Sequence, residues 1–368
     1  MLQGLLDNPK DFFIHSERFS ISVMFSAIFG VRLVQLDHPT MTAFFEIWTE
    51  MLDYFQPGTL LVDHFPILNR LPERFQPWLR LARDLHKREL NLYQPFVDTL
   101  RAQVRAGTAP ACFAADFWKL KENECISDTE AIGIFGMLIG AGADAPNSII
   151  QTFFKIMAMN PIAFQIDQVV GQSRLPTWED QERLPYLRAL IKEVHRWAPI
   201  GTLGVPHATS EDDQDIGVPK GTILFPNLTS LNRDPDVYEN PDEFCPERFL
   251  HDHLDASASA NHPDFRKRDH YHYGFGRRVC QGIFVAEASL YIVFSRIIWA
   301  FDISPAMGAP PLDLNDKKPG LITKPKPYSV QIEVRSDVVR QAIRTAASEA
   351  KTGILDFDSV KAAERSMS

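Results

Sequence analysis

The stretch YGFGRRVCQG, residues 273–282, holds the residues whose types and spacing point most clearly to chemistry. Cys280 lies in this glycine-rich loop, with two arginines before it and an apolar run after it. A thiolate stays ionised beside positive charge or backbone N–H donors, and the first amides of a following helix are such donors. Gly276 and Gly282 let the main chain approach a flat ligand closely. The loop therefore indicates an anionic sulfur ready to bind a metal, although a buried cysteine or a phosphate-binding loop also fits Cys280 alone.

The spacing in this loop resembles the haem-binding signature of the cytochrome P-450 family, F-x-x-G-x-R-x-C-x-G. Gly276, Arg278, Cys280 and Gly282 occupy four of its five fixed positions, and Tyr273 stands where the family has Phe. The resemblance implies that the cofactor is haem b, iron protoporphyrin IX, with the Cys280 thiolate as the axial iron ligand. It also implies that Arg278 pairs with a haem propionate, because the arginine fork suits carboxylates.

Two further segments resemble motifs of the same family. Glu193 and Arg196 match its E-x-x-R motif, and the PERF segment, residues 246–249, contributes Arg248. The resemblance implies a buried glutamate between two arginines that fixes the loops behind the haem and is stable only when all three are present. Taken alone, Glu193 and Arg196 would form a surface ion pair. His207 falls where the family often places a second propionate partner, and a surface-loop histidine is an equal alternative.

The run AGADAP, residues 141–146, resembles the oxygen-binding motif of the family's long helix. A Thr closes that motif in the family and helps to deliver protons to dioxygen, whereas this sequence has Ala145. We hypothesise a water chain through Asp144, Ser148 or the substrate itself. Pro146 supports it, because proline leaves the carbonyl four residues earlier without its helical partner. The alternative is that a helix rich in Gly and Ala only permits close packing.

The elements expected to position these residues are mostly helical. Apolar periodicity predicts helices over 12–34, 41–55, 73–106, 185–197 and 283–300. The capping box Ser127-x-x-Glu130 predicts another helix from near Asp128, and we expect an interruption at Pro146. Short strands are expected at 222–225 and 328–334, and little core is expected after Arg335.

We therefore predict a mainly α protein with the cytochrome P-450 fold, a helical bundle around the haem with small β-sheets, lacking the N-terminal portion of the family. Residues 1–368 form one truncated catalytic domain in this interpretation. Its parts are a mainly helical region over 1–198, a mixed β and loop region over 199–335, and a tail over 336–368.

Net charge and the spacing of histidines and cysteines argue against several classes of partner and site. A net charge of −9 argues against a nucleic-acid binder, and the 11 histidines and four cysteines show no zinc-type or disulfide-type spacing. We see no signal peptide and no membrane span, so we expect an intracellular chain. The resemblance adds that the family usually works at the endoplasmic reticulum membrane, facing the cytosol, although no anchor is visible in this sequence.

The resemblance implies a haem-thiolate monooxygenase that inserts one oxygen atom from O2 into a hydrophobic small molecule. Its electrons come from NADPH through a flavoprotein reductase, which would dock on the basic cluster Arg266, Lys267, Arg268 and Arg277; a solvated charge run is the alternative. The amino-acid sequences of these motifs resemble those of fungal members of the family that act in secondary-metabolite biosynthesis. Two alternatives stay open: a haem-dependent isomerase, dehydratase or peroxygenase, and a truncated inactive paralogue.

Overall fold

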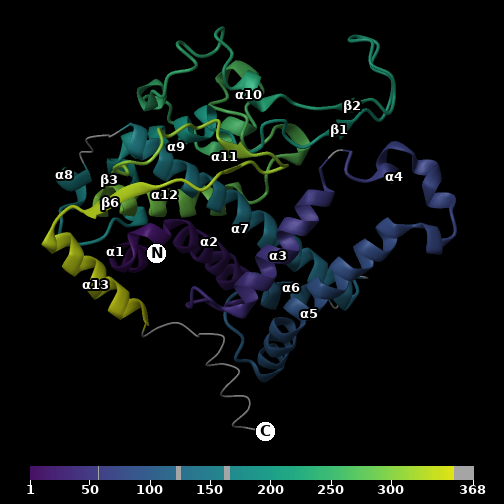
Figure 1. Ribbon diagram of the computed structural model, residues 1–368, viewed down its shortest axis with the longest axis horizontal. Coiled ribbons are helices and arrows are strands. Elements are labelled where there is room, and N and C mark those ends of the chain that lie inside the picture. Colours follow the sequence, from purple (N-terminus) through teal and green to yellow (C-terminus); the bar gives the residue numbers. More distant parts are fainter. Residues whose placement is uncertain (57, 122–125, 161–165, 352–368) are drawn as a thin grey trace. The chain divides into compact units, whose positions relative to one another are not determined.

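A computed structural model describes residues 1–56, 58–121, 126–160 and 166–351 of the chain (Figure 1). The described residues are mainly helical and include three two-stranded antiparallel sheets. Contacts divide the chain into two compact units, and the division falls between Asn147 and Ser148. The first unit contains mainly residues 13–147, and the second contains residues 2–12 and 148–347.

The first unit is built of helices around an aromatic core. Phe25 and Phe29 of one helix pack on Phe96 of another, with ring centroids 5.0 and 5.5 Å apart, and Phe29 also meets Phe135 at 5.7 Å. Phe25 and Phe29 lie about one turn apart in the same helix, so both rings lie on one face of it. The elements are α2 (Phe12–Phe29), α3 (Pro39–Tyr54), α4 (Leu61–His64), η2 (Pro66–Arg70), η3 (Glu73–Phe75), α5 (Pro77–Ala106), α6 (Phe113–Lys121) and the first part of α7 (Asp128–Met159).

Glycines in α7 allow neighbouring side chains to pack directly on its backbone. A Cβ on Gly140 would lie 1.9 Å from the Trp48 ring, and one on Gly136 would lie 2.1 Å from Oε1 of Glu89. A third glycine, Gly142, meets a methionine of α2 in the same way. Close packing therefore accounts for these three glycines, whatever the motif at residues 141–146 does.

The second unit holds the remaining helices and all the strands among the described residues. β1 (His207–Ala208) pairs with β2 (Ile223–Leu224), β3 (Phe301–Pro305) with β6 (Val330–Val334), and β4 (Lys317–Lys318) with β5 (Lys324–Pro325). The helical elements are α1 (Leu2–Asp7), η1 (Pro9–Asp11), α8 (Ile166–Val170), η4 (Trp178–Arg183), α9 (Pro185–Trp197), α10 (Leu228–Leu231), η5 (Pro246–Phe249), α11 (Ala256–Ala260), η6 (Phe265–Lys267), η7 (Gly276–Arg278), α12 (Ile283–Ala300) and α13 (Asp337–Lys351).

α12 forms the core of the second unit. Phe294 stacks on Phe153 with ring centroids 3.7 Å apart, and the indole N–H of Trp299 donates to the carbonyl of Gly171 at 2.7 Å. Within the described residues, α12 is the helix whose length and apolar composition would also suit a membrane span, and 56% of it is buried inside the protein. These contacts give its apolar faces a role in the core.

Several predicted boundaries are confirmed. α9 and α12 have the bounds expected from their periodicity, and α7 begins at Asp128 after a capping box. In that box the Glu130 carboxylate accepts from the Ser127 amide at 2.8 Å, and the Glu130 amide donates to the Ser127 hydroxyl at 3.2 Å. Apolar periodicity was sufficient for α9 and α12, which have no side-chain cap, and the capping box was sufficient for the start of α7.

Three expectations are wrong. α7 continues through Pro146, because a proline removes one hydrogen bond while the buried faces on both sides of it hold the helix together. The first long helix ends at Phe29, followed by Gly30 with a φ of +69°, which favours glycine and stops a helix. The tail forms α13, which buries Val339 and Ile343 at i, i+4 spacing.

Candidate functional site

The loop around Cys280 is closed by its own backbone. The Cys280 amide donates to the Tyr273 carbonyl at 2.9 Å, and the Val279 amide donates to the Gly276 carbonyl at 3.2 Å. Gly274 and Gly276 have φ values of +75° and +76°, where residues with a side chain are strained. The glycines thus turn the chain, and the hydrogen bonds fix the backbone on which the Cys280 side chain is mounted.

The Cys280 sulfur needs a cation to become a thiolate. Cys280 is exposed at the surface, but neighbouring protein atoms remove part of its hydration and raise the pKa of the thiol, and a hydrogen bond from the Gly282 amide offsets part of this rise. The protein by itself therefore favours the protonated thiol at neutral pH. A metal ion bound at the sulfur would supply the missing positive charge, since coordination deprotonates a thiol outright.

The surroundings of the loop fit a flat, apolar, anionic group such as haem. A Cβ added to Gly274 or Gly276 would meet no atom within 4 Å, so both glycines border open space. Phe284 and Val285, in the first turn of α12, are 67% and 48% exposed although both are apolar. Arg278 is also exposed and has no ion pair within the described residues, which suits a propionate from outside the chain.

Glu193, Arg196 and Arg248 come together in a buried cluster. Arg196 donates to both Glu193 carboxylate oxygens at 2.7 and 2.8 Å, and Nε of Arg248 lies 3.2 Å from Oε2 of the same carboxylate. The Cys245 amide donates to Glu193 Oε1 at 2.8 Å. One carboxylate is therefore shared by two guanidinium groups, and backbone carbonyls accept the remaining N–H donors of both arginines, so that the polar atoms of this buried cluster are hydrogen-bonded.

This cluster reaches toward the cysteine loop through Asn232. Nη1 of Arg196 donates to the Asn232 carbonyl at 2.8 Å, and the Asn232 side-chain oxygen accepts from the Tyr271 amide at 3.1 Å. Tyr271 precedes the glycine-rich turn by a few residues. The ion cluster thus supports the chain that leads into the Cys280 loop.

Comparison with known proteins decides the family. The sequence pattern of the cytochrome P-450 family matches residues 6–332. The chain belongs to the cytochrome P-450 family. Its predicted fold class, mainly α with small antiparallel sheets, is confirmed by this match and by the structure. Membership of the family implies a haem cofactor.

Proteins similar to this chain include fungal members of the family named monooxygenases. The chain is 57% identical over 367 residues to cytochrome P-450 monooxygenase polD of Polytolypa hystricis, covering 98% of this chain and 71% of that protein. It is 34% identical over 372 residues to cytochrome P-450 monooxygenase virE of Hypocrea virens, covering 97% and 67%. Cytochrome P-450 monooxygenase fogE of Aspergillus ruber is 34% identical over 352 residues, covering 92% and 64%. The expectation of an oxidoreductase family is confirmed by these names.

The other predicted site residues of this cytochrome P-450 lie on β1 and α7. His207 is exposed in β1, and within the described residues no hydrogen bond or ion pair joins it to Arg278 or Cys280. Asp144 and Ser148 are both fully buried in α7, the first in the first unit and the second in the second unit. The Ser148 hydroxyl has no hydrogen-bond partner within the described part of the chain.

Sequence reasoning missed a buried polar cluster next to the cysteine loop. Lys192 contacts Asp252 at 2.7 Å and Asp269 at 3.1 Å. Nearby, the ring centroid of His195 lies 4.9 Å from that of His270, and burial lowers the pKa of His270 well below its usual value. No group of three His, Cys, Asp or Glu side chains in the described ranges is arranged to hold a metal ion. One sequence feature could have indicated polar side chains in this region: Tyr273 carries a hydroxyl at the position where the family has Phe.

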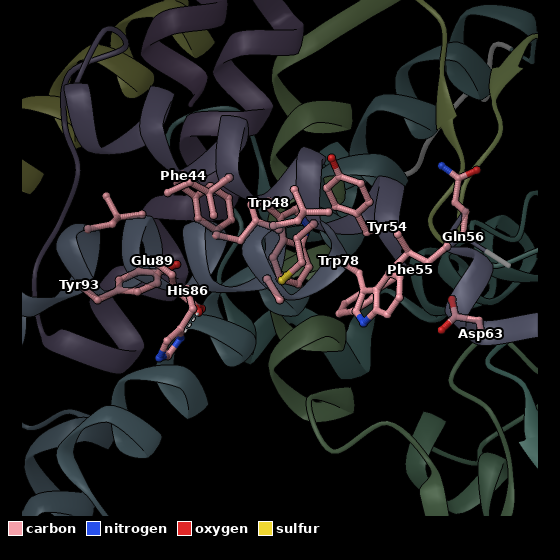
Figure 2. Close-up of a pocket in the computed structure, with 17 residues that line it drawn as sticks. Phe44, Trp48, Tyr54, Phe55, Gln56, Asp63, Trp78, His86, Glu89 and Tyr93 are labelled. Atoms are coloured by element: carbon pink, nitrogen blue, oxygen red, sulfur yellow. Dashed lines mark ion pairs between the residues drawn. The ribbon is translucent and has the colours of Figure 1, made fainter. Parts of the chain in front are cut away.

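The first unit contains an apolar pocket of about 480 Å³ between α3 and α5 (Figure 2). Its volume lies within the range of small-molecule sites. Glu89 is a polar group in its wall, and burial raises the pKa of this carboxyl. The side chains that line it are mostly aromatic or aliphatic and include Phe44, Trp48, Tyr54, Trp78, Leu85 and Tyr93.

Proposed function

We propose that this chain is a haem-thiolate monooxygenase with Cys280 as the axial iron ligand of haem b. The observation that carries the proposal is the closed Cys280 loop, in which the Tyr273 carbonyl holds the Cys280 amide and the Gly282 amide donates to the sulfur. Arg278 and His207 are the proposed propionate partners, and Gly276 and Gly282 keep the backbone close to the macrocycle. The names of the relatives support the same activity.

Bound haem supplies the iron at which dioxygen is reduced so that one oxygen atom can enter the substrate. The chain's own residues supply position and charge. The Gly282 amide offsets part of the negative charge on the Cys280 sulfur, and Arg278 neutralises a carboxylate. Glu193, Arg196 and Arg248 hold the segments that precede the loop.

We infer that protons reach the dioxygen site by a water chain through Asp144, Ser148 or the substrate itself, because Ala145 lacks the hydroxyl of the family's Thr. The support is that both side chains are buried and that a hydroxyl on a helix can hold a water molecule. Separate Asp144→Asn and Ser148→Ala variants test this inference. If oxygen consumption stays fully coupled to product in both, protons do not pass through these residues.

A hydrophobic small molecule is the substrate that the chain's surfaces support. The pocket between α3 and α5 is lined mainly by apolar side chains, with Glu89 and His86 as polar groups. We propose that this pocket contacts an apolar substrate. We also propose that the protein acts in fungal secondary-metabolite biosynthesis. Its proposed location is inside the cell, at the endoplasmic reticulum membrane.

Electrons are proposed to come from NADPH through a flavoprotein reductase. Arg266, Lys267 and Arg277 are exposed, and Arg268 is partly held by its hydrogen bond to the His262 carbonyl at 2.9 Å. Three exposed cations so close to Cys280 in sequence suit an acidic partner surface. Ala145 favours a second candidate, a haem enzyme that does not activate O2, such as an isomerase, a dehydratase or a peroxygenase.

The deciding experiment compares the full chain with its Cys280→Ser variant, each loaded with haem, reduced and treated with carbon monoxide. We expect the Soret band of thiolate-ligated haem in the unmodified chain and its loss in the variant, because a serine hydroxyl does not replace the thiolate. Absence of that band in the unmodified chain would refute both haem-enzyme proposals. Product formation that needs NADPH and reductase separates the monooxygenase from the second candidate.

A further inference from the structure

Tyr273 connects the cysteine loop to two helices at once. Its carbonyl accepts the Cys280 amide at 2.9 Å, and its hydroxyl donates to Oε1 of Glu287 at 2.6 Å. The same hydroxyl lies 3.2 Å from Nε2 of His195. Because Glu287 belongs to α12 and His195 to α9, one side chain links the loop to both.

The hydrogen-bond roles follow from the donors available. The single hydroxyl proton of Tyr273 goes to Glu287, so its oxygen is left to accept from Nε2 of His195. Burial alone would raise the pKa of Glu287, but hydrogen bonds from His195 and Tyr273 lower it. The carboxylate is therefore an ionised acceptor, which makes the Tyr273 hydrogen bond a charge-assisted one.

Burial makes this arrangement costly to disturb. Tyr273 is 7% exposed and His195 is 1% exposed, so neither can turn to water for a replacement partner. A Phe at position 273 would fill the same volume but would leave both Glu287 and His195 one partner short. Glu287 and His195 therefore provide hydrogen-bond partners for the hydroxyl of Tyr273, which the family's Phe does not have.

We propose that Tyr273 is a positioning residue for the haem ligand, and that Glu287 and His195 hold its hydroxyl so that its carbonyl fixes the Cys280 main chain. The inference rests on the proposed role of Cys280 as iron ligand. The side chain of Tyr273 acts on the sulfur through the backbone. Hydrogen bonds to Glu287 and His195 fix the ring, and the fixed residue keeps its carbonyl in place to accept the Cys280 amide. The position of the Cys280 main chain in turn sets the direction of its side chain. Loss of the hydroxyl should therefore loosen the iron–sulfur bond without removing it.

The test uses the full, haem-loaded chain and its Tyr273→Phe and Glu287→Gln variants. The readouts are the ratio of thiolate-type to non-thiolate Soret absorbance in the reduced carbon monoxide complex, and the midpoint potential of the iron. Loss of this part-buried hydrogen bond to a charged group should lower that ratio roughly tenfold in Tyr273→Phe. The two changes act on one hydrogen bond, so the double variant should lose less than the product of the single effects.

Tyr291→Phe is the matched control, because it removes another buried phenolic hydroxyl of the same unit. The Tyr291 hydroxyl makes no hydrogen bond within the described residues, and the residue is 1% exposed. We expect this variant to keep the ratio and the potential of the unmodified chain. If Tyr273→Phe does not take up haem, Glu287→Gln alone must lower the ratio for the inference to stand.

Failure of the positioning role and failure of the proposed function are distinguishable. A Tyr273→Phe variant with the ratio and potential of Tyr291→Phe would overturn the positioning role while leaving Cys280 as the ligand. An unmodified chain without a thiolate-type band would instead overturn the proposed function itself.

Discussion

Replacing Glu193 by Gln should destabilise the second unit strongly. The change keeps the shape of the side chain but removes its charge, so Arg196 stays buried, at 0% exposure, without a balancing anion. Arg196 cannot leave, because it also donates to the carbonyls of Asn232 and Pro241 at 2.8 Å each. Removing one partner of a buried ion pair costs about 3–5 kcal/mol.

Urea unfolding of the full chain measures this cost. With a slope of about 3 kcal/mol per M, the expected loss moves the midpoint down by about 1–2 M. Asp242→Asn is the control, because it breaks the ion pair with Arg233 in the same region, where the Asp242 side chain is 80% exposed. A Glu193→Gln midpoint equal to that of Asp242→Asn would refute the view that the Glu193 cluster holds this region together.

Three further changes test other parts of the chain. Gly140→Ala should cost about 1–3 kcal/mol of unfolding free energy, since its Cβ would lie 1.9 Å from Trp48; unchanged urea unfolding would contradict this packing. Val339→Ala should lower the free energy of unfolding by roughly 1–3 kcal/mol if α13 docks as described, and no loss would mean that the helix is not anchored. Burial lowers the pKa of Lys317 to about 8, so unfolded chains bind more protons between pH 8 and the usual lysine pKa. Stability should therefore rise with pH across that window, and Lys317→Met should flatten this part of a urea-midpoint profile measured against pH.

The features that the sequence predicted well are those fixed by neighbours along the chain. α9 and α12 follow from apolar periodicity, and the start of α7 follows from the Ser127 capping box. The Cys280 loop is local too, since the hydrogen bond to the Tyr273 carbonyl spans seven residues. Short-range geometry of this kind is encoded in spacing, which is why a motif can represent it.

The features that escaped prediction depend on contacts between distant residues. Pro146 favours a break in α7, but the buried faces on either side of it hold the helix together. The tail is mostly polar, yet two apolar residues one turn apart, Val339 and Ile343, are enough to bury one face of α13. In both cases tertiary packing outweighs the local preference.

The contacts of Tyr273 with His195 and Glu287 could not be predicted from the sequence alone, although two of the three residues are unusual at their positions. His195 is 78 residues from Tyr273 in the chain, so spacing alone cannot pair them. Glu287 is one of two charged residues in the otherwise apolar helix α12; the other, Arg296, donates to the Pro176 carbonyl at 3.0 Å. A charge on a core helix requires a partner, because burial without one is expensive. The charge of Glu287 in an apolar helix, together with the hydroxyl of Tyr273 where the family has Phe, indicates a polar contact inside the protein. The packing of α9 against α12 then brings in His195 as the third member of this contact.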